Sequence, residues 1–339
     1  MTLMNRPGWH DLVEEAPLDP DRPIIDSHHH LWDVPWHNYM PEEFIQDFSG
    51  HNVRATVYVE CHSHYYKQGP EALRSLGETE FAVEQAQLAK TLASNQKLKC
   101  EIAAGIVSYV DLQLGDAVGD VLDAHIDAAQ GRFRGVRNAS AWDPHEEVRN
   151  AHSNPPKGLL YDSEFRKGFA QLVKRGLSFD AYHFQHQIHE LVDLARAFPE
   201  ATIISNHFGG FVGVGPYQNK LKESLALWSE SITKLAACPN VYMKLGGIAM
   251  TNNGFGWHKQ KFPLSSEAYT EFYMPWYEHT IEQFGPSRCM FESNFPVDRV
   301  SINYGALMNA FKRLTREFSE SEKNMMFHDT ANKVYQLGL

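Results

Sequence analysis

Short apolar runs rich in β-branched residues alternate with longer amphipathic stretches along the chain. Each run is bounded by polar or turn-forming residues, which predicts a buried strand. Between the runs, apolar residues recur at helical spacing; in 117–130, for example, Val118, Val121 and Leu122 fall on one face. The predicted strands cover residues 24–28, 52–60, 100–108, 132–137, 177–181, 201–206, 240–245 and 289–292.

Predicted helices separate and follow these strands, at about 70–95, 117–130, 163–174, 187–198, 221–237, 266–284, 303–317 and 319–336. Regular alternation of strand and helix predicts an α/β protein with a parallel sheet, and eight units predict that the sheet closes into a (β/α)8 TIM barrel. An open doubly wound sheet is the alternative. The glycines of 209–215 do not support it, because no acidic residue ends a following strand at the distance that a dinucleotide fingerprint requires.

The chain is expected to divide into an arm and one domain. Residues 1–23 are polar, acidic and proline-bearing, so we expect an arm that wraps the domain or contacts a partner chain. Residues 24–339 are expected to form the single barrel, a length that such barrels use as one domain. Hydrophobic residues make up 43% of the chain, enough for a large core.

The net charge and the cysteine pattern limit the classes of partner and the cellular location that we expect. The formal net charge of −11 argues against nucleic acid or an anionic membrane, both of which favour basic surfaces. No apolar run has transmembrane length, no signal-peptide pattern is present, and the four cysteines are scattered. We therefore expect a cytoplasmic protein that acts on a small molecule and forms a homo-oligomer through its arm and aromatic loops.

Residues that can do chemistry follow the carboxyl ends of the predicted strands, where the active sites of such barrels lie. Three histidines end the first strand. Because side chains alternate along a strand, His28 and His30 should project to one side and His29 to the other, so the first two could bind one metal ion. The other polar residues at strand ends are Glu60, His62, His64, Arg134, Arg137, Asp180, Tyr182, His183, His207, Lys244, Glu292 and Asn294.

Six motifs contain most of these residues: DSHHHLW (26–32), RGVR (134–137), FD (179–180), NHFGG (206–210), VYMKLGG (241–247) and ESNFPV (292–297). Together they resemble the amidohydrolase superfamily, in the amidohydrolase-related branch that includes sugar lactonases and pyrone-dicarboxylate lactonases. The resemblance implies that His28, His30 and His207 bind a divalent metal, or bind substrate directly as in metal-free members. Many members place a further metal histidine after strand five, where His183 stands. Zinc is the first expectation for the metal, with manganese and iron as alternatives.

One position departs from the family. The strand-eight aspartate, which activates water in the family, falls at Asn294, and an amide cannot take a proton from water. Glu60 and Glu292 are the candidates to replace it, as bases or as oxygen ligands to a metal. The alternative is that each forms a structural ion pair with Arg134, Arg137 or Lys244. A third acid, Asp298, is expected to cap the next element.

Several other residues are weaker candidates. His62 and His64 could form a second metal pair by the same alternation, and His186 and His189 follow strand five but could face solvent. Arg137 resembles the arginines that grip substrate carboxylates in the related lactonases, which leaves Arg134 to the fold; Lys244 is a further substrate-binding candidate. The aromatic residues of the long loops could form a lid over the site or a subunit interface: Trp142, Phe211, Tyr217, Phe255 and Trp257.

These residues predict a metal-dependent hydrolase that cleaves a lactone, or a similar ester or amide, in a small carboxylated molecule. The metal would lower the pKa of a bound water and polarise the carbonyl, while Glu60 or Glu292 handles protons and Arg137 orients the substrate. Three alternatives stay open: a metal-dependent decarboxylase, a non-haem iron oxygenase on the same scaffold, and a non-catalytic subunit that has lost its base at Asn294.

Overall fold

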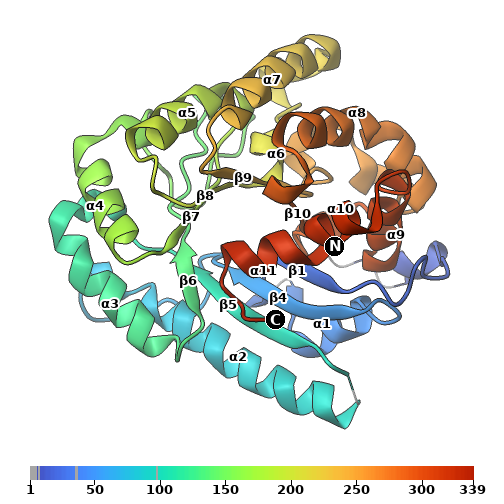
Figure 1. Cartoon of the computed structure of the whole chain (residues 1–339), viewed down its shortest axis with the longest axis horizontal. Helices are drawn as coiled ribbons and strands as arrows, with labels where there is room; N and C mark the ends of the chain where they lie inside the picture. The colour runs from blue at the N-terminus through green and yellow to red at the C-terminus, as the bar shows by residue number, and fades with distance from the viewer. Residues whose placement is uncertain (1–5, 7, 35–36, 97) are drawn as a thin grey trace.

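The computed structural model describes residue 6 and residues 8–34, 37–96 and 98–339. Eight parallel strands form one sheet in which each strand is hydrogen-bonded to the next along the chain (Figure 1). They are β1 (Ile24–His29), β4 (Val53–Val59), β5 (Glu101–Ser108), β6 (Phe133–Val136), β7 (Ser178–Ala181), β8 (Ile203–Ser205), β9 (Val241–Leu245) and β10 (Cys289–Phe291). Each lies within one residue of a predicted strand or inside it, which confirms the predicted barrel.

The barrel closes between β10 and β1 through loop hydrogen bonds rather than a regular ladder. The backbone N–H of Asn294 donates to the carbonyl of His28 (2.9 Å), and the N–H of His30 donates to the carbonyl of Phe295 (2.7 Å). These two bonds, which we call the seam, join the segment after β10 to the end of β1. The seam therefore brings the first histidine motif beside the last motif of the chain.

Helices surround the barrel in Figure 1. They are α1 (Pro41–Asp47), α2 (Leu76–Asn95), α3 (Val118–Ala128), α4 (Ser163–Lys174), α5 (Ile188–Ala197), α6 (His207–Gly210), α7 (Leu221–Ala236), α8 (Ser266–Phe284), α9 (Tyr304–Leu314), α10 (Glu320–Asn324) and α11 (Thr330–Val334). Side-chain caps fix several starts: Asp162 accepts from the N–H of Phe165 at α4, and Asn303 accepts from the N–H of Ala306 at α9.

Two features were not predicted. A small antiparallel hairpin of β2 (Trp32–Val34) and β3 (His37–Tyr39) follows β1, because three-residue strands leave too short a pattern to recognise. The single helix expected at 319–336 is interrupted by a wider π-helical turn at Met325–Asp329, in which Met326 and Phe327 are both buried.

The core has an inner and an outer part. Inside the barrel, β-branched and small residues such as Ile25, Val57 and Ile204 pack with Tyr335, which follows α11. Outside, the other strand faces pack against the helices. The C-terminal segment therefore supplies a side chain to the barrel interior. No helix in the described part of the chain is long and apolar enough to cross a membrane.

The chain before β1 runs along the C-terminal helices. The amide of Asn303 donates to the carbonyls of His10 and Val13, and Arg22 forms an ion pair with Glu320 (2.6 Å). These contacts hold His10, Val13 and Arg22 against the C-terminal helices, and the division into an arm and one domain stays a prediction. Residues 1–5 and 7 lie outside the described residues.

Candidate metal and active site

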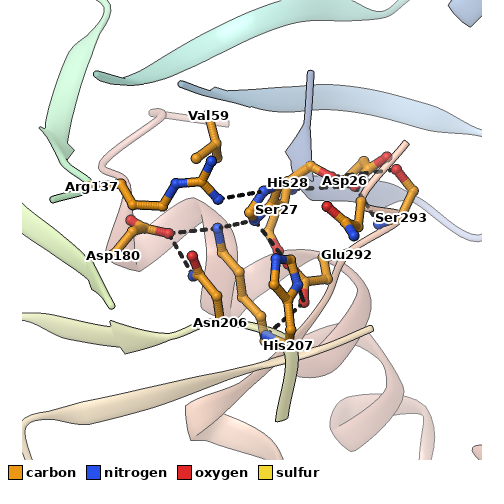
Figure 2. A network of polar contacts seen from close by, with 12 residues as sticks. Asp26, Ser27, His28, Val59, Arg137, Asp180, Asn206, His207, Glu292 and Ser293 are labelled. Carbon is orange, nitrogen blue, oxygen red and sulfur yellow. Dashed lines mark hydrogen bonds and ion pairs between the residues drawn. The ribbon is translucent and has the colours of Figure 1, made fainter. Parts of the chain in front are cut away.

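Three buried side chains meet at the carboxyl ends of the strands (Figure 2). His28 belongs to β1, His207 begins α6 one residue beyond β8, and Glu292 directly follows β10. Nδ1 of His28 lies 3.0 Å from one carboxylate oxygen of Glu292, and Nδ1 of His207 lies 2.7 Å from the other. The backbone N–H of His207 also donates to Glu292 (3.0 Å). One glutamate carboxylate therefore bridges two histidines that are far apart in the sequence.

Two glycines after β9 allow this close approach. A Cβ on Gly246 would lie 2.1 Å from the backbone oxygen of Glu292, and a Cβ on Gly247 would lie 1.9 Å from Nδ1 of His207. Gly247 also has a φ of +62°, in the left-handed region that glycine adopts without strain. The VYMKLGG motif is thus explained by the space that the bridging carboxylate and His207 occupy.

The bridged group fits a divalent metal. One donor atom from each of His28, His207 and Glu292 can be chosen so that all lie within 4.8 Å of one another. Oε2 of Glu292 is buried and makes no hydrogen bond within the described residues, because its 3.0 Å approach to Nδ1 of His28 lacks hydrogen-bond geometry. Burial and the charge of Lys244 hold the pKa of His28 well below its usual value, so the ring is neutral and can donate a lone pair. Two imidazole nitrogens and a carboxylate oxygen are a donor set that zinc and similar ions accept.

The other two histidines of the motif lie as the alternation predicts. His30 turns toward His28, with 3.3 Å between their Nε2 atoms, and its Nδ1 donates to the carbonyl of Val59 (2.7 Å). The carbonyl fixes the proton on Nδ1, which leaves the lone pair of Nε2 facing the site. His29 points to the other side, onto Thr56 and Phe44.

Two cationic side chains approach His28 from different strands. Nζ of Lys244 lies 3.3 Å from Nδ1 of His28 and donates to Asp180 (2.6 Å). Asp180 also accepts from Asn206 (3.0 Å) and from the hydroxyl of Tyr335 (2.9 Å). The Lys244 ammonium is therefore held in place by the Asp180 carboxylate, which also accepts hydrogen bonds from two other residues.

Arg137 is the second cation, and it is held by Glu60. Its Nε donates to the carboxylate of Glu60 (2.6 Å), its Nη2 donates to the backbone carbonyl of the same residue, and its Nη1 lies 3.3 Å from Nε2 of His28. Burial alone would raise the pKa of Glu60, but the charges of His152 and Arg137 outweigh it and bring the pKa below the usual range. Glu60 thus forms an ion pair with Arg137, and a catalytic role for Glu60 stays a prediction. Arg134 donates to backbone carbonyls near its own strand.

At strand eight, Asn294 donates its amide N–H to Asp298 (2.8 Å), and the backbone N–H of Ala249 donates to the other oxygen of that acid (3.0 Å). Burial raises the pKa of Asp298 to about 7. The expectation that Asp298 caps the next element is wrong, because its side chain turns inward and makes no capping bond to the short helix Asp298–Val300.

Some predicted residues lie apart from the bridged group. The ring nitrogens of His183 face the carbonyl of Phe184 (3.1 Å) and the hydroxyl of Ser205 (3.4 Å). Trp257 donates to the hydroxyl of Tyr273 on α8 (2.9 Å). A metal role for His183 and a substrate role for Trp257 stay predictions.

The predicted histidines after strands two and five also make contacts outside the bridged group. The ring of His62 packs at a tilt against Tyr65, and that of His64 stacks on Phe81. Nε2–H of His186 donates to the backbone carbonyl of Trp142 (3.1 Å). Within the described residues, no group of three metal donors includes any of these histidines.

Two residues of the network were missed from the sequence. His152, in the long loop after β6, lies with Nε2 2.8 Å from the carboxylate of Glu60. Tyr335 reaches Asp180 from the end of the chain. Neither lies in a motif or at a strand end, so no local pattern marks it.

Buried histidines and a carboxylate thus meet at the ends of strands one, six and eight of a TIM barrel, the face at which the active sites of such barrel enzymes lie. The chain belongs to the amidohydrolase family, whose model matches residues 25–337. This confirms the resemblance found in the six motifs.

The curated relatives extend over almost the whole chain. An uncharacterized protein, y4mH, from Sinorhizobium fredii is 32% identical and covers 94% of this chain and 99% of its own length. An L-rhamnono-gamma-lactonase from Scheffersomyces stipitis is 22% identical (93% and 98% covered), and an L-fucono-1,5-lactonase from Burkholderia multivorans is 22% identical (92% and 96%).

Solved structures show the same fold. A Burkholderia multivorans amidohydrolase with bound zinc superposes with a TM-score of 0.65 at 21% identity, covering 92% of this chain and 99% of that one. A putative 2-pyrone-4,6-dicarboxylic acid hydrolase from Pseudomonas putida superposes with a TM-score of 0.61 at 17% identity, covering 93% and 98%.

Proposed function

We propose that this protein is a metal-dependent hydrolase that opens a lactone, or a similar ester or amide, in a small carboxylated molecule. The observation that carries the proposal is the buried Glu292 carboxylate that bridges His28 and His207. The sugar lactonases among its relatives, and the zinc bound by a structure of the same fold, support this choice of reaction and metal.

His28, His207 and Glu292 would hold the metal, with Nε2 of His30 as a further candidate ligand. When bound, a divalent ion in such a site supplies a water of lowered pKa and polarises the carbonyl that is attacked. The protein's own contribution is a set of imidazoles and a carboxylate that are held in place before any ligand arrives.

Arg137 and Lys244 would bind and orient the substrate. Both cations are fixed by buried carboxylates, Glu60 and Asp180, so little side-chain entropy is lost when they bind a ligand. Arg137 keeps N–H groups beyond those that Glu60 accepts, and a guanidinium matches a carboxylate with two parallel hydrogen bonds. This arrangement favours a substrate with a carboxylate next to the bond that is cleaved.

Proton transfer must involve groups other than Asn294. Glu60 is a poor proton acceptor, because its oxygens are engaged by two cationic groups and its pKa is lowered. Glu292 touches both histidines of the metal group, so it is the carboxylate placed to take a proton from an attacking water.

The test combines metal analysis with a lactone panel. Untagged protein would be stripped with a chelator, reloaded with Zn²⁺, Mn²⁺ or Fe²⁺ and assayed by acid release from L-fucono-1,5-lactone, L-rhamnono-γ-lactone and 2-pyrone-4,6-dicarboxylate. Glu292→Gln should lose at least tenfold in metal affinity and all measurable activity, whereas Glu230→Gln on the exposed face of α7 should match the wild type. Full metal content in Glu292→Gln would refute the site.

A decarboxylase is the second candidate, and Asn294 favours it. With no carboxylate at the end of strand eight, the usual base for water is missing, which matters less for a reaction that releases CO2. Release of CO2 from small carboxylated molecules, with the lactones inert, would select this alternative.

A further inference from the structure

We infer that His152 is the proton carrier of this site, giving a proton to the leaving oxygen and recovering it from solvent. The inference rests on the proposed hydrolysis and names a residue for it. His152 lies in the loop 138–158 between β6 and α4, outside every motif. Its Nε2 is 2.8 Å from Oε2 of Glu60.

A continuous polar path runs from His152 to the metal group. The second oxygen of Glu60 accepts from Nε of Arg137 (2.6 Å), and Nη1 of Arg137 lies 3.3 Å from Nε2 of His28. The side chains of Glu60 and Arg137 are 0% and 6% exposed, whereas that of His152 is 31% exposed. His152 is therefore the member of this path that meets solvent.

The buried carboxylate prepares the imidazole for proton transfer. With the Nε2–H donated to Glu60, the orientation and the tautomer of the ring are fixed, and the second nitrogen is left for exchange. Nδ1 has no hydrogen bond to the described residues. The other ionisable groups around the ring are Arg137 and Glu78, together with the ring of His62 at 5.5 Å between centroids.

The charges around His152 favour its use as a general acid. The carboxylate of Glu60 raises the pKa of His152, against smaller effects of burial and of Arg137. The raised pKa shifts the ring toward its protonated form, the form that a general acid needs. A carboxylic acid in the same place would already be ionised.

Water adds to the lactone carbonyl and gives its proton to Glu292, and the bond from the carbonyl carbon to the ring oxygen breaks. The Nδ1–H bond of His152 breaks as the released oxygen takes that proton, so a hydroxy acid forms and the imidazole becomes neutral. The imidazole then takes a proton from solvent and Glu292 releases its proton to solvent, while the Nε2–H bond of His152 to Glu60 is kept.

His145 provides a matched control on the same loop. Its Nδ1 lies 2.7 Å from a carboxylate oxygen of Asp143, and its side chain is 49% exposed. The same oxygen of Asp143 also accepts from the backbone N–H of His145, and its second oxygen accepts from the hydroxyl of Tyr217. The backbone N–H of Asp143 donates to the amide oxygen of Asn150, so these contacts stabilise the loop. The pair of His145 with Asp143 has the same chemistry as the pair of His152 with Glu60 but no link to Arg137.

The first test is kinetic and uses the metal-loaded full chain with whichever panel lactone the wild type opens. His152→Ala should lower kcat about 100-fold or more with KM within threefold, and it should lose the alkaline limb of the pH–rate profile. Free imidazole should restore part of kcat, because the position is open to solvent. His145→Ala should stay within about twofold, with no response to imidazole. An unchanged alkaline limb, or no imidazole rescue, would overturn the inference.

The second test needs no substrate. In ¹⁵N-labelled protein, the imidazole signal that disappears in His152→Gln identifies the residue, and its titration should lie above the ordinary value near 6.5 and fall in Glu60→Gln. A titration at or below 6.5 would overturn the inference even if lactones are hydrolysed. A raised titration in a protein that opens no lactone would instead show that the proposed function has failed while the pair with Glu60 exists.

Discussion

The ion pair of Lys244 with Asp180 gives the sharpest prediction on stability. Nζ and Oδ1 are 2.6 Å apart, and both side chains are 0% exposed. Replacing Asp180 by Asn leaves the lysine ammonium buried, with Nδ1 of His28 at 3.3 Å as its remaining close neighbour. Replacing Lys244 by Met leaves the carboxylate with the N–H of Asn206 and the hydroxyl of Tyr335.

The magnitudes follow from what each change leaves unpaired. Asp180→Asn should cost about 3–5 kcal/mol of unfolding free energy, the usual result of stranding one buried charge. Lys244→Met should cost less, about 2–3 kcal/mol, because two donors still serve the carboxylate. The double variant removes both charges, so its cost should fall short of the sum of the single costs by at least about 2 kcal/mol.

Urea unfolding of the metal-free protein measures these values without a contribution from metal binding. The control is the pair of Lys234 with Glu230 on α7, which has the same 2.6 Å separation but side chains 63% and 64% exposed. Its coupling should stay below about 0.5 kcal/mol because solvent screens it. A coupling for the buried pair as small as that of the exposed pair would refute the reasoning.

Three further predictions concern single positions. Gly247→Ala should reduce bound metal at least tenfold by displacing His207. Gly256→Ala, at a similar φ (+74°) but in open space, should keep its metal. Elemental analysis of the two preparations measures this difference in metal content. Burial raises the pKa of Glu78 to about 7, so between pH 4.5 and 7 the folded state holds a proton that the unfolded chain has lost. The free energy of unfolding should therefore fall by up to about 3 kcal/mol from pH 4.5 to 7.5. This pH dependence, measured by urea unfolding, should flatten in Glu78→Gln. Asn294→Asp should place a second carboxylate against Asp298, so its melting temperature should drop more at pH 8 than at pH 5, and an equal drop at both pH values would contradict the contact.

The barrel could be predicted from sequence because buried parallel strands are short apolar runs and their helices have a clear period. The hairpin β2–β3 and the π-helical turn at Met325–Asp329 escaped prediction, since both depend on packing rather than on a repeating pattern.

The part of the site that lies on a single strand could be predicted from the sequence. Alternation alone places His28 beside His30 and turns His29 away. The bridge of Glu292 between His28 and His207 was not predictable, because it depends on how closely three strands approach and on the two glycines that permit it. His152 and Tyr335 reach the site from a loop and from the C-terminal segment, and no local spacing encodes such contacts.

The seam between β10 and β1 has a consequence for how the barrel opens. Two backbone hydrogen bonds close it, at Asn294 and His30, and the side chains that flank them include Glu292 and His28. A metal held by those side chains would link β1 to the segment after β10 across the seam. It would therefore bind the closed barrel more tightly than an opened one. Metal occupancy and barrel closure are then thermodynamically linked, and each tenfold rise in free metal above its dissociation constant adds about 1.4 kcal/mol against opening. The amide hydrogens of Asn294 and His30 should accordingly exchange with solvent more slowly as the metal concentration rises.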